Sequence, residues 1–118
     1  MEEFDIAIIG GGPAGIMAAI AASADLNIVL LEKNSSLGSK LLITGGGRCN
    51  ITNEKPIKKL LNSFHDKNFL KHSFYTFTNE MLLDLFRNRG LDFIVEDNNR
   101  VFPETEKSQD ILAILKYY

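Results

Sequence analysis

Two glycine clusters hold the residues of this chain whose types and spacing could do chemistry. The first, Gly10-Gly-Gly-Pro-Ala-Gly15, has the spacing G-x-G-x-x-G. The second, Gly45 to Gly47, leads directly into Arg48 and the only cysteine, Cys49. Glycine has no Cβ, so backbone N–H groups in such clusters can approach an anion closely. Both clusters therefore indicate places where the main chain contacts a ligand.

The elements on either side of the first cluster must position it. The apolar run Phe4 to Ile9 predicts a buried parallel strand, and the alanine-rich segment Pro13 to Ala24 predicts a helix. Asn27 to Leu31 predicts a second strand, with Glu32 at its end. Strand, glycine turn, helix and strand in about 30 residues form one right-handed βαβ unit. The predicted fold class is α/β, with a Rossmann-like unit.

In such a unit each marked residue has a task. Gly10 allows the sharp turn, and Gly12 lets N–H groups reach a pyrophosphate at the positive end of the helix. Gly15 lets the helix pack close to the strands, and Glu32 can accept hydrogen bonds from an adenosine ribose. The alternative is a structural glycine turn with a solvated Glu32. A P-loop is excluded because no Gly-Lys-Ser/Thr sequence follows.

The second cluster lies in a polar, glycine-rich segment, Lys33 to Asn53, which shows no periodicity and predicts a loop. Loops of about twenty residues inside a domain are usually functional. Gly45 to Gly47 could bring N–H groups to the ribityl and ring portion of a flavin dinucleotide, where Arg48 would neutralise phosphate or ring charge. Cys49 could be a redox thiol or a buried space-filler beside the flavin, and we favour the second interpretation. Without another cysteine no disulfide relay can operate within the chain.

The remaining segments predict supporting structure. The aromatic cluster of residues 64–77 could stack nucleic-acid bases, but it lacks interleaved arginines, so we expect it to pack in the core. His65 and His72 have no partners at metal-ligand spacing. The further predicted elements are short helices over 58–61 and 66–77, a helix from Asn79 to Arg89 capped by Thr78 and stopped by Gly90, a hairpin of Leu91 to Val95 with Arg100 to Phe102, and a last helix that Ser108 would cap.

Composition narrows the class of protein. The 118 residues carry a net charge of −2, which argues against a general polyanion binder, so we expect no nucleic-acid partner. No apolar run approaches the roughly 20 residues of a membrane span. The opening MEEF lacks a basic signal-peptide segment, and a single cysteine fits a reducing compartment, so we expect a cytoplasmic protein without a membrane partner.

The motifs together resemble a known family. GGGPAG, LLEKN, GSKLLITGGGRCNITN and NRVFPETEKSQDIL, spread over essentially the whole chain, are similar to the N-terminal part of the BaiN/RdsA-type FAD-dependent oxidoreductases, also called YhiN-like or aminoacetone-oxidase-like flavoproteins. The resemblance implies an FAD cofactor, with NAD(P)H as a candidate electron donor and a small-molecule substrate that the sequence does not identify. The cofactor-binding residues that it or the glycine patterns imply are Gly10, Gly12, Pro13, Ala14 and Gly15 at the pyrophosphate, Glu32 and Lys33 at the adenosine half, and Lys40, Gly46, Gly47, Arg48, Cys49 and Asn50 towards the flavin.

The resemblance also implies that this chain is the N-terminal part of an FAD/NAD(P)-binding domain whose remainder and substrate-side domain are absent. Two strands then make an incomplete parallel sheet, so we expect self-association through unpaired strand edges. The expected function is the FAD-binding part of a flavoprotein oxidoreductase. The alternatives are a non-catalytic dinucleotide-binding module and, less favoured because of TGGGRCN and the strict glycine spacing, an S-adenosylmethionine-dependent methyltransferase.

Overall fold

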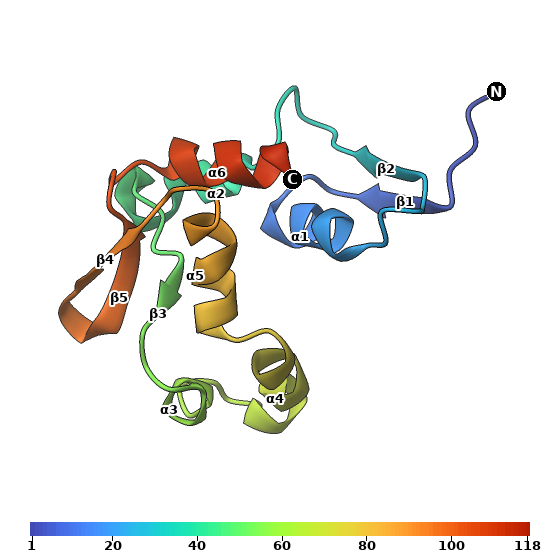
Figure 1. The fold of residues 1–118 in the computed structure, drawn as a ribbon. Helices are drawn as coiled ribbons and strands as arrows, with labels where there is room; N and C mark the ends of the chain where they lie inside the picture. Colours follow the sequence, from blue (N-terminus) through green and yellow to red (C-terminus); the bar gives the residue numbers. More distant parts are fainter.

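The βαβ unit forms at the amino terminus, as the sequence predicts. A computed structural model describes all 118 residues, and in it strand β1 (Ile6–Ile9), helix α1 (Pro13–Ala21) and strand β2 (Ile28–Leu31) follow one another. The two strands pair in parallel, with Ile6 opposite Ile28 (Figure 1). Helix α1 ends three residues earlier than predicted because the backbone is already extended at Ala22. The α/β, Rossmann-like fold class is confirmed.

This parallel pair is a sheet of its own, with only the order β1-β2. The side chains of Ile9 and Leu31 are 86% and 51% exposed, although their apolar character predicts burial. Figure 1 shows the pair with α1 at one end of an elongated molecule, whose extents are 51 × 33 × 26 Å. Both long edges of the two-stranded sheet therefore lack a neighbouring strand.

A second, antiparallel sheet has the order β3-β5-β4. It contains β3 (Thr52–Asn53) and the hairpin of β4 (Phe93–Glu96) with β5 (Arg100–Pro103). The tight turn Asp97–Asn99 joins the hairpin strands, and two asparagines in it adopt positive φ, which asparagine tolerates better than most residues. The predicted hairpin is confirmed, with its first strand starting two residues later.

The prediction of a loop throughout residues 33–53 is wrong. The segment contains α2 (Ser39–Ile43), a 3-10 turn (Thr44–Gly47) and strand β3. Five helical residues make little more than one turn, so no periodic pattern marks them in the sequence. Burial of Leu41 in the core holds the short helix in place.

Three further helices complete the middle of the chain: α3 (Ile57–Leu61), α4 (Lys67–Thr76) and α5 (Asn79–Arg87). The predicted cap is confirmed, because the Thr78 hydroxyl accepts a 3.2 Å hydrogen bond from the Met81 N–H. None of the helices has the length and apolar character needed to cross a membrane.

Helix α6 (Ser108–Tyr117) closes the core by packing against α1, α2 and β5 (Figure 1). Its prediction as a helix is confirmed, but Ser108 as its N-cap is wrong, since Lys107 holds that position. The buried Ser108 hydroxyl instead donates a 2.7 Å hydrogen bond to the Leu42 carbonyl and so joins α6 to α2. The core consists of Ile16, Leu41, Cys49, Phe86, Leu91, Ile111, Leu112 and Leu115.

The expectation that the aromatic cluster packs in the core is also wrong. Phe69 is 80% exposed, and no residue of α4 is fully buried. Phe64 and Phe74 contact each other with ring centroids 5.4 Å apart and α3 packs against α4, but these contacts do not cover Phe69. Aromatic content alone could not reveal this, because burial requires a partner element as well as an apolar side chain.

Candidate functional site

A cleft of about 370 Å³ opens at the carboxyl ends of β1 and β2. We call it the glycine cleft. This is the edge at which ligands bind in open α/β sheets. It is lined by Ile9, Gly10, Gly11, Gly12, Pro13, Leu31, Glu32, Lys33, Asn34, Gly38, Ser39 and Lys40.

The glycines of the cleft differ in what they do. Gly10 has a φ of 104°, which side-chain-bearing residues rarely adopt, so it makes the turn after β1. A Cβ at Gly15 would overlap the Gly10 carbonyl oxygen, so only glycine lets α1 start this close to the strand. At Gly12, by contrast, a Cβ would meet no atom of the chain within 4 Å. The space above Gly12 is therefore open to a ligand.

The amino terminus of α1 faces this open space. The backbone N–H groups of Gly12 and Ala14 donate no hydrogen bond within the chain, and no side chain caps the helix. Orphan N–H groups at the positive end of a helix form an anion site that suits phosphate oxygens. The residues present thus fit a pyrophosphate.

Glu32 supplies the negative charge of the cleft. Its carboxylate accepts hydrogen bonds from the N–H groups of Asn34 (2.9 Å) and Gly11 (2.7 Å). These bonds lower the pKa of Glu32 below its ordinary value, with Asn34 the largest cause and Gly11 the next. A fixed, ionised carboxylate beside an anion site suits the hydroxyl groups of a ribose and disfavours a phosphate there.

A second cavity of about 420 Å³ adjoins the glycine cleft and shares Pro13 and Lys40 with it. We call it the apolar pocket. Nine of its thirteen lining residues are hydrophobic, which suits a flat, largely apolar ring system. The lining residues are Pro13, Ala14, Met17, Lys40, Leu41, Thr44, Cys49, Asn50, Ile51, Leu82, Phe86, Ile111 and Leu115.

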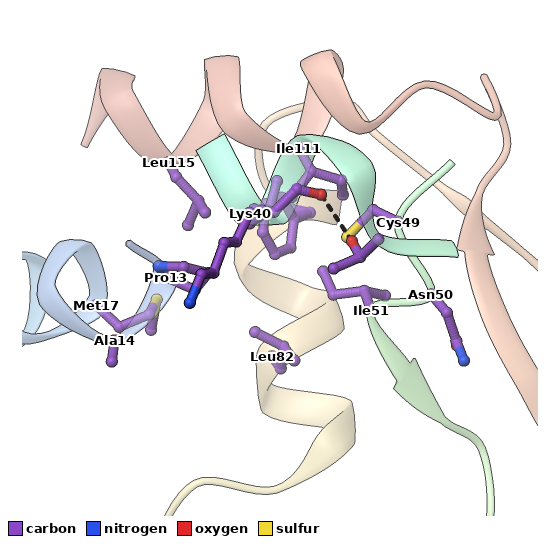
Figure 2. A pocket seen from close by; sticks show the side chains of 13 residues that line it. Pro13, Ala14, Met17, Lys40, Cys49, Asn50, Ile51, Leu82, Ile111 and Leu115 are labelled. Carbon is purple, nitrogen blue, oxygen red and sulfur yellow. Dashed lines mark hydrogen bonds between the residues drawn. The ribbon is translucent and has the colours of Figure 1, made fainter. Parts of the chain in front are cut away.

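Figure 2 shows how the labelled side chains border the apolar pocket. Lys40 extends from α2 towards Pro13 at the start of α1, so its ammonium group lies between the two cavities. Asn50 lies at the rim, with its side chain directed away from Lys40. A cation at the junction can serve a diphosphate on one side and a ring on the other.

Cys49 forms part of the inner wall of the apolar pocket. It is only 5% exposed, and burial raises the pKa of its thiol. Its φ of 63° lies in the left-handed region, which is uncommon for a residue with a side chain. A protonated, buried thiol agrees with the space-filling interpretation rather than with an activated nucleophile.

The structure brings most of the predicted residues to these two cavities. Gly46, Gly47 and Arg48 line neither of them. The Arg48 guanidinium instead forms ion pairs with Glu96 and Glu106. Gly15 also lines neither cavity, and lies where α1 packs against the Gly10 carbonyl. The predicted residues that line a cavity are Gly10, Gly12, Pro13, Ala14, Glu32, Lys33, Lys40, Cys49 and Asn50.

Sequence reasoning missed the far wall of the apolar pocket. Leu82 and Phe86 come from α5, and Ile111 and Leu115 come from α6. Each pair is spaced i, i+4, which marks one face of a helix but is the same signal that any core residue gives. Sequence reasoning also missed Gly38. This residue has a φ of 71° and forms the turn that starts α2 beside the cleft.

The sequence of this chain is similar to those of known proteins. Residues 4–117 match the model of the HI0933-like protein Rossmann domain. The chain is 34% identical over 114 residues to the 3-dehydro-bile acid delta(4,6)-reductase of Clostridium scindens, covering 94% of this chain and 27% of that protein. It is 33% identical over 118 residues to the ribosomal RNA dihydrouridine synthase of Escherichia coli, covering 98% and 28%.

A third match is shorter. Ferredoxin–NADP reductase 1 of Bacillus pumilus is 50% identical over 44 residues, which is 36% of this chain and 13% of that protein. The chain spans about a quarter of the length of the bile-acid reductase and of the dihydrouridine synthase. A match to the family model over nearly every residue shows that this chain belongs to the HI0933-like Rossmann family.

Proposed function

We propose that this chain is the FAD-binding part of a flavoprotein oxidoreductase that takes electrons from a reduced nicotinamide. The observation that carries the proposal is the open space above Gly12, which the unpaired N–H groups of α1 face and which shares Pro13 and Lys40 with the apolar pocket. These surfaces suit a ligand that has a charged diphosphate at its centre, a ribose at one end and a flat ring at the other.

In this proposal each residue has one task. Glu32 accepts hydrogen bonds from the adenosine ribose, and Gly12 and Ala14 donate theirs to the pyrophosphate. Lys40 balances negative charge between the cavities, and Lys33 does the same at the adenosine end. The side chains of the apolar pocket exclude water from the ring. When bound, FAD supplies the electron- and hydride-transfer chemistry, while the protein orients it and sets its surroundings.

The relatives support the oxidoreductase class. The two long matches are named as a bile-acid reductase and a dihydrouridine synthase, and a third relative is named as a ferredoxin–NADP reductase. The last name supports a nicotinamide as a redox partner of this chain, and the proposal adds that the nicotinamide is the donor. The names of the first two relatives differ in substrate, so the substrate class of this chain does not follow from them.

The experiment loads the purified chain with FAD and adds NADH or NADPH without oxygen. After unbound FAD is removed by gel filtration, we expect the flavin absorption bands, at about 370 and 450 nm, to stay with the protein and the longer one to bleach with a nicotinamide. Binding without bleaching by either donor would favour the non-catalytic dinucleotide-binding module. Uptake of S-adenosylmethionine in place of FAD would favour the methyltransferase and contradict the proposal.

A further inference from the structure

The turn that carries Cys49 has an unusual backbone. Gly45, Gly46 and Gly47 have φ values of 56°, 68° and 88°, and Cys49 follows at 63°. A Cβ at Gly45 would come within 2.6 Å of the Asn50 nitrogen, so the turn folds tightly on itself. A left-handed residue with a side chain is held only where its surroundings fix it. Within the turn, the Cys49 N–H donates a 3.0 Å hydrogen bond to the Thr44 carbonyl, and just after it the Ile51 N–H donates one of 3.0 Å to Val101 of β5. Side-chain contacts from outside the turn can add to these backbone bonds.

Arg48 makes the contacts that fix the turn from outside. Its Nη1 lies 2.8 Å from one carboxylate oxygen of Glu96 and its Nη2 lies 3.2 Å from the other, so the pair is bidentate. Nη1 also lies 3.1 Å from Glu106. The guanidinium carbon sits 4.0 Å from the centre of the buried Phe102 ring. Bidentate pairing and stacking on an aromatic face both restrict the arginine to one geometry.

The partners of Arg48 all belong to the hairpin region. Glu96 ends β4, Phe102 lies in β5, and Glu106 follows β5. The other charged group nearby is Arg100, whose Nη2 lies 3.9 Å from Glu96. Arg48 is thus anchored to the hairpin and to the segment that follows it, while the residues directly after Arg48, Cys49 and Asn50, form part of the wall of the apolar pocket.

We propose that Arg48 is a positioning residue: its ion pairs with Glu96 and Glu106 hold the Cys49–Asn50 segment in place as the wall of the apolar pocket, and Arg48 itself does not contact the ligand. This inference rests on the proposed function, in which the apolar pocket takes the flavin end of FAD. It replaces the sequence-based expectation that the Arg48 charge faces the phosphate or the ring.

Two measurements test the role of Arg48, and the first needs no cofactor. The rate at which Cys49, the only thiol, reacts with a disulfide reagent reports whether the turn stays closed. We expect Arg48→Ala to raise this rate by about tenfold or more, since the left-handed turn loses its side-chain anchor to the hairpin and keeps only its backbone bonds. The matched control is Arg87→Ala, because Arg87 is comparably exposed and its acid partners, Glu80, Asp84 and Asp92, line neither cavity. An unchanged rate in a folded Arg48→Ala protein would overturn the inference.

The second measurement compares the dissociation constants for FAD and ADP. ADP reaches only the glycine cleft, so we expect Arg48→Ala to weaken FAD by about tenfold and to leave ADP unchanged. Glu96→Gln should reproduce part of the FAD loss, and Arg48→Ala with Glu96→Gln should be no worse than Arg48→Ala alone, because both act through one contact. Equal losses for FAD and ADP, or fully additive losses in the double variant, would mean that Arg48 meets the ligand directly.

A urea melt of each variant separates local from global effects. Should Arg48→Ala not fold, Arg48→Lys keeps the charge without the bidentate geometry and is expected to give an intermediate thiol rate. A wild-type rate for a folded Arg48→Lys protein would then count against the bidentate clamp. If the wild-type chain binds no FAD, the proposed function fails, whereas the thiol measurement still decides whether Arg48 holds the turn.

Discussion

The backbone N–H of Gly11 donates a 2.7 Å hydrogen bond to a carboxylate oxygen of Glu32, which lies 21 residues further along the chain. This bond ties the glycine turn after β1 to the end of β2, so the two halves of the glycine cleft are fixed relative to each other. The same carboxylate accepts from Asn34 and keeps its charge at the cleft. One side chain therefore shapes the cleft and supplies its acidic group.

Replacing Glu32 tests this double role. We expect Glu32→Ala to weaken ADP and FAD equally, by about tenfold or more, because the acceptor for the ribose and the anchor of the turn are lost together. Titration calorimetry with both ligands measures the effect. Asp5→Ala is the matched control, since Asp5 accepts from the Asn27 N–H at the opposite end of the strands. Unchanged affinity in Glu32→Ala would reduce Glu32 to a solvated strand end.

Gly15 should be intolerant of any side chain. A Cβ there would overlap the Gly10 carbonyl oxygen, which is backbone and cannot move aside without reshaping the turn. We expect Gly15→Ala to lower the free energy of unfolding by roughly 1–3 kcal/mol, the usual cost of overpacking. Gly12→Ala is the control, because nothing lies within 4 Å of its added methyl group. Equal urea midpoints for the two variants would show that the close approach of α1 to β1 is not needed.

The thiol of Cys49 should behave as a passive group. Burial raises its pKa above the ordinary value of 9.0, so the folded protein keeps the thiol protonated at neutral pH. The stabilisation linked to this neutral thiol is complete below the ordinary value and is lost as the pH rises through the folded-state value. We expect Cys49→Ser to bind FAD as the wild type does. We also expect its free energy of unfolding to fall less steeply than that of the wild type as the pH rises above neutrality. A complete loss of redox activity with flavin still bound would assign the thiol an active role.

The two-stranded sheet should make the chain associate. Both strands lack outer neighbours and Ile9 is 86% exposed, so another copy can pair along the edge or cover the face. We expect sedimentation to show association that increases with protein concentration, and Ile9→Lys to reduce it. Ile43→Lys serves as the control, since Ile43 is 75% exposed but lies on α2. A monodisperse wild-type monomer with a cooperative urea transition would contradict this prediction.

The parts of the fold that could be predicted are those encoded by neighbouring residues. The βαβ unit follows from two apolar runs and a glycine spacing, and the Thr78 cap follows from its place before an amphipathic helix. The glycine cleft could be predicted from the sequence for the same reason. Gly10, Gly12 and Glu32 take their roles from backbone geometry within one unit.

The parts that could not be predicted depend on distant partners. Arg48 meets acids 48 and 58 residues away, and no local pattern says which charges a guanidinium will find. Ser108 uses its hydroxyl on a carbonyl 66 residues earlier instead of capping its own helix. Phe69 is exposed because the contact of α3 with α4 does not cover it, and the sequence of α4 alone does not show which of its faces a neighbour will cover.

The most direct test of the central claim is a titration of FAD into the wild-type chain and into Gly12→Val, with ADP as competitor. Valine at Gly12 would occupy the open space assigned to the pyrophosphate without meeting another atom of the chain within 4 Å of its Cβ. The account predicts that the wild type binds FAD, that ADP displaces it, and that Gly12→Val loses both ligands while keeping the wild-type urea midpoint. A folded Gly12→Val protein with undiminished affinity for FAD would contradict it.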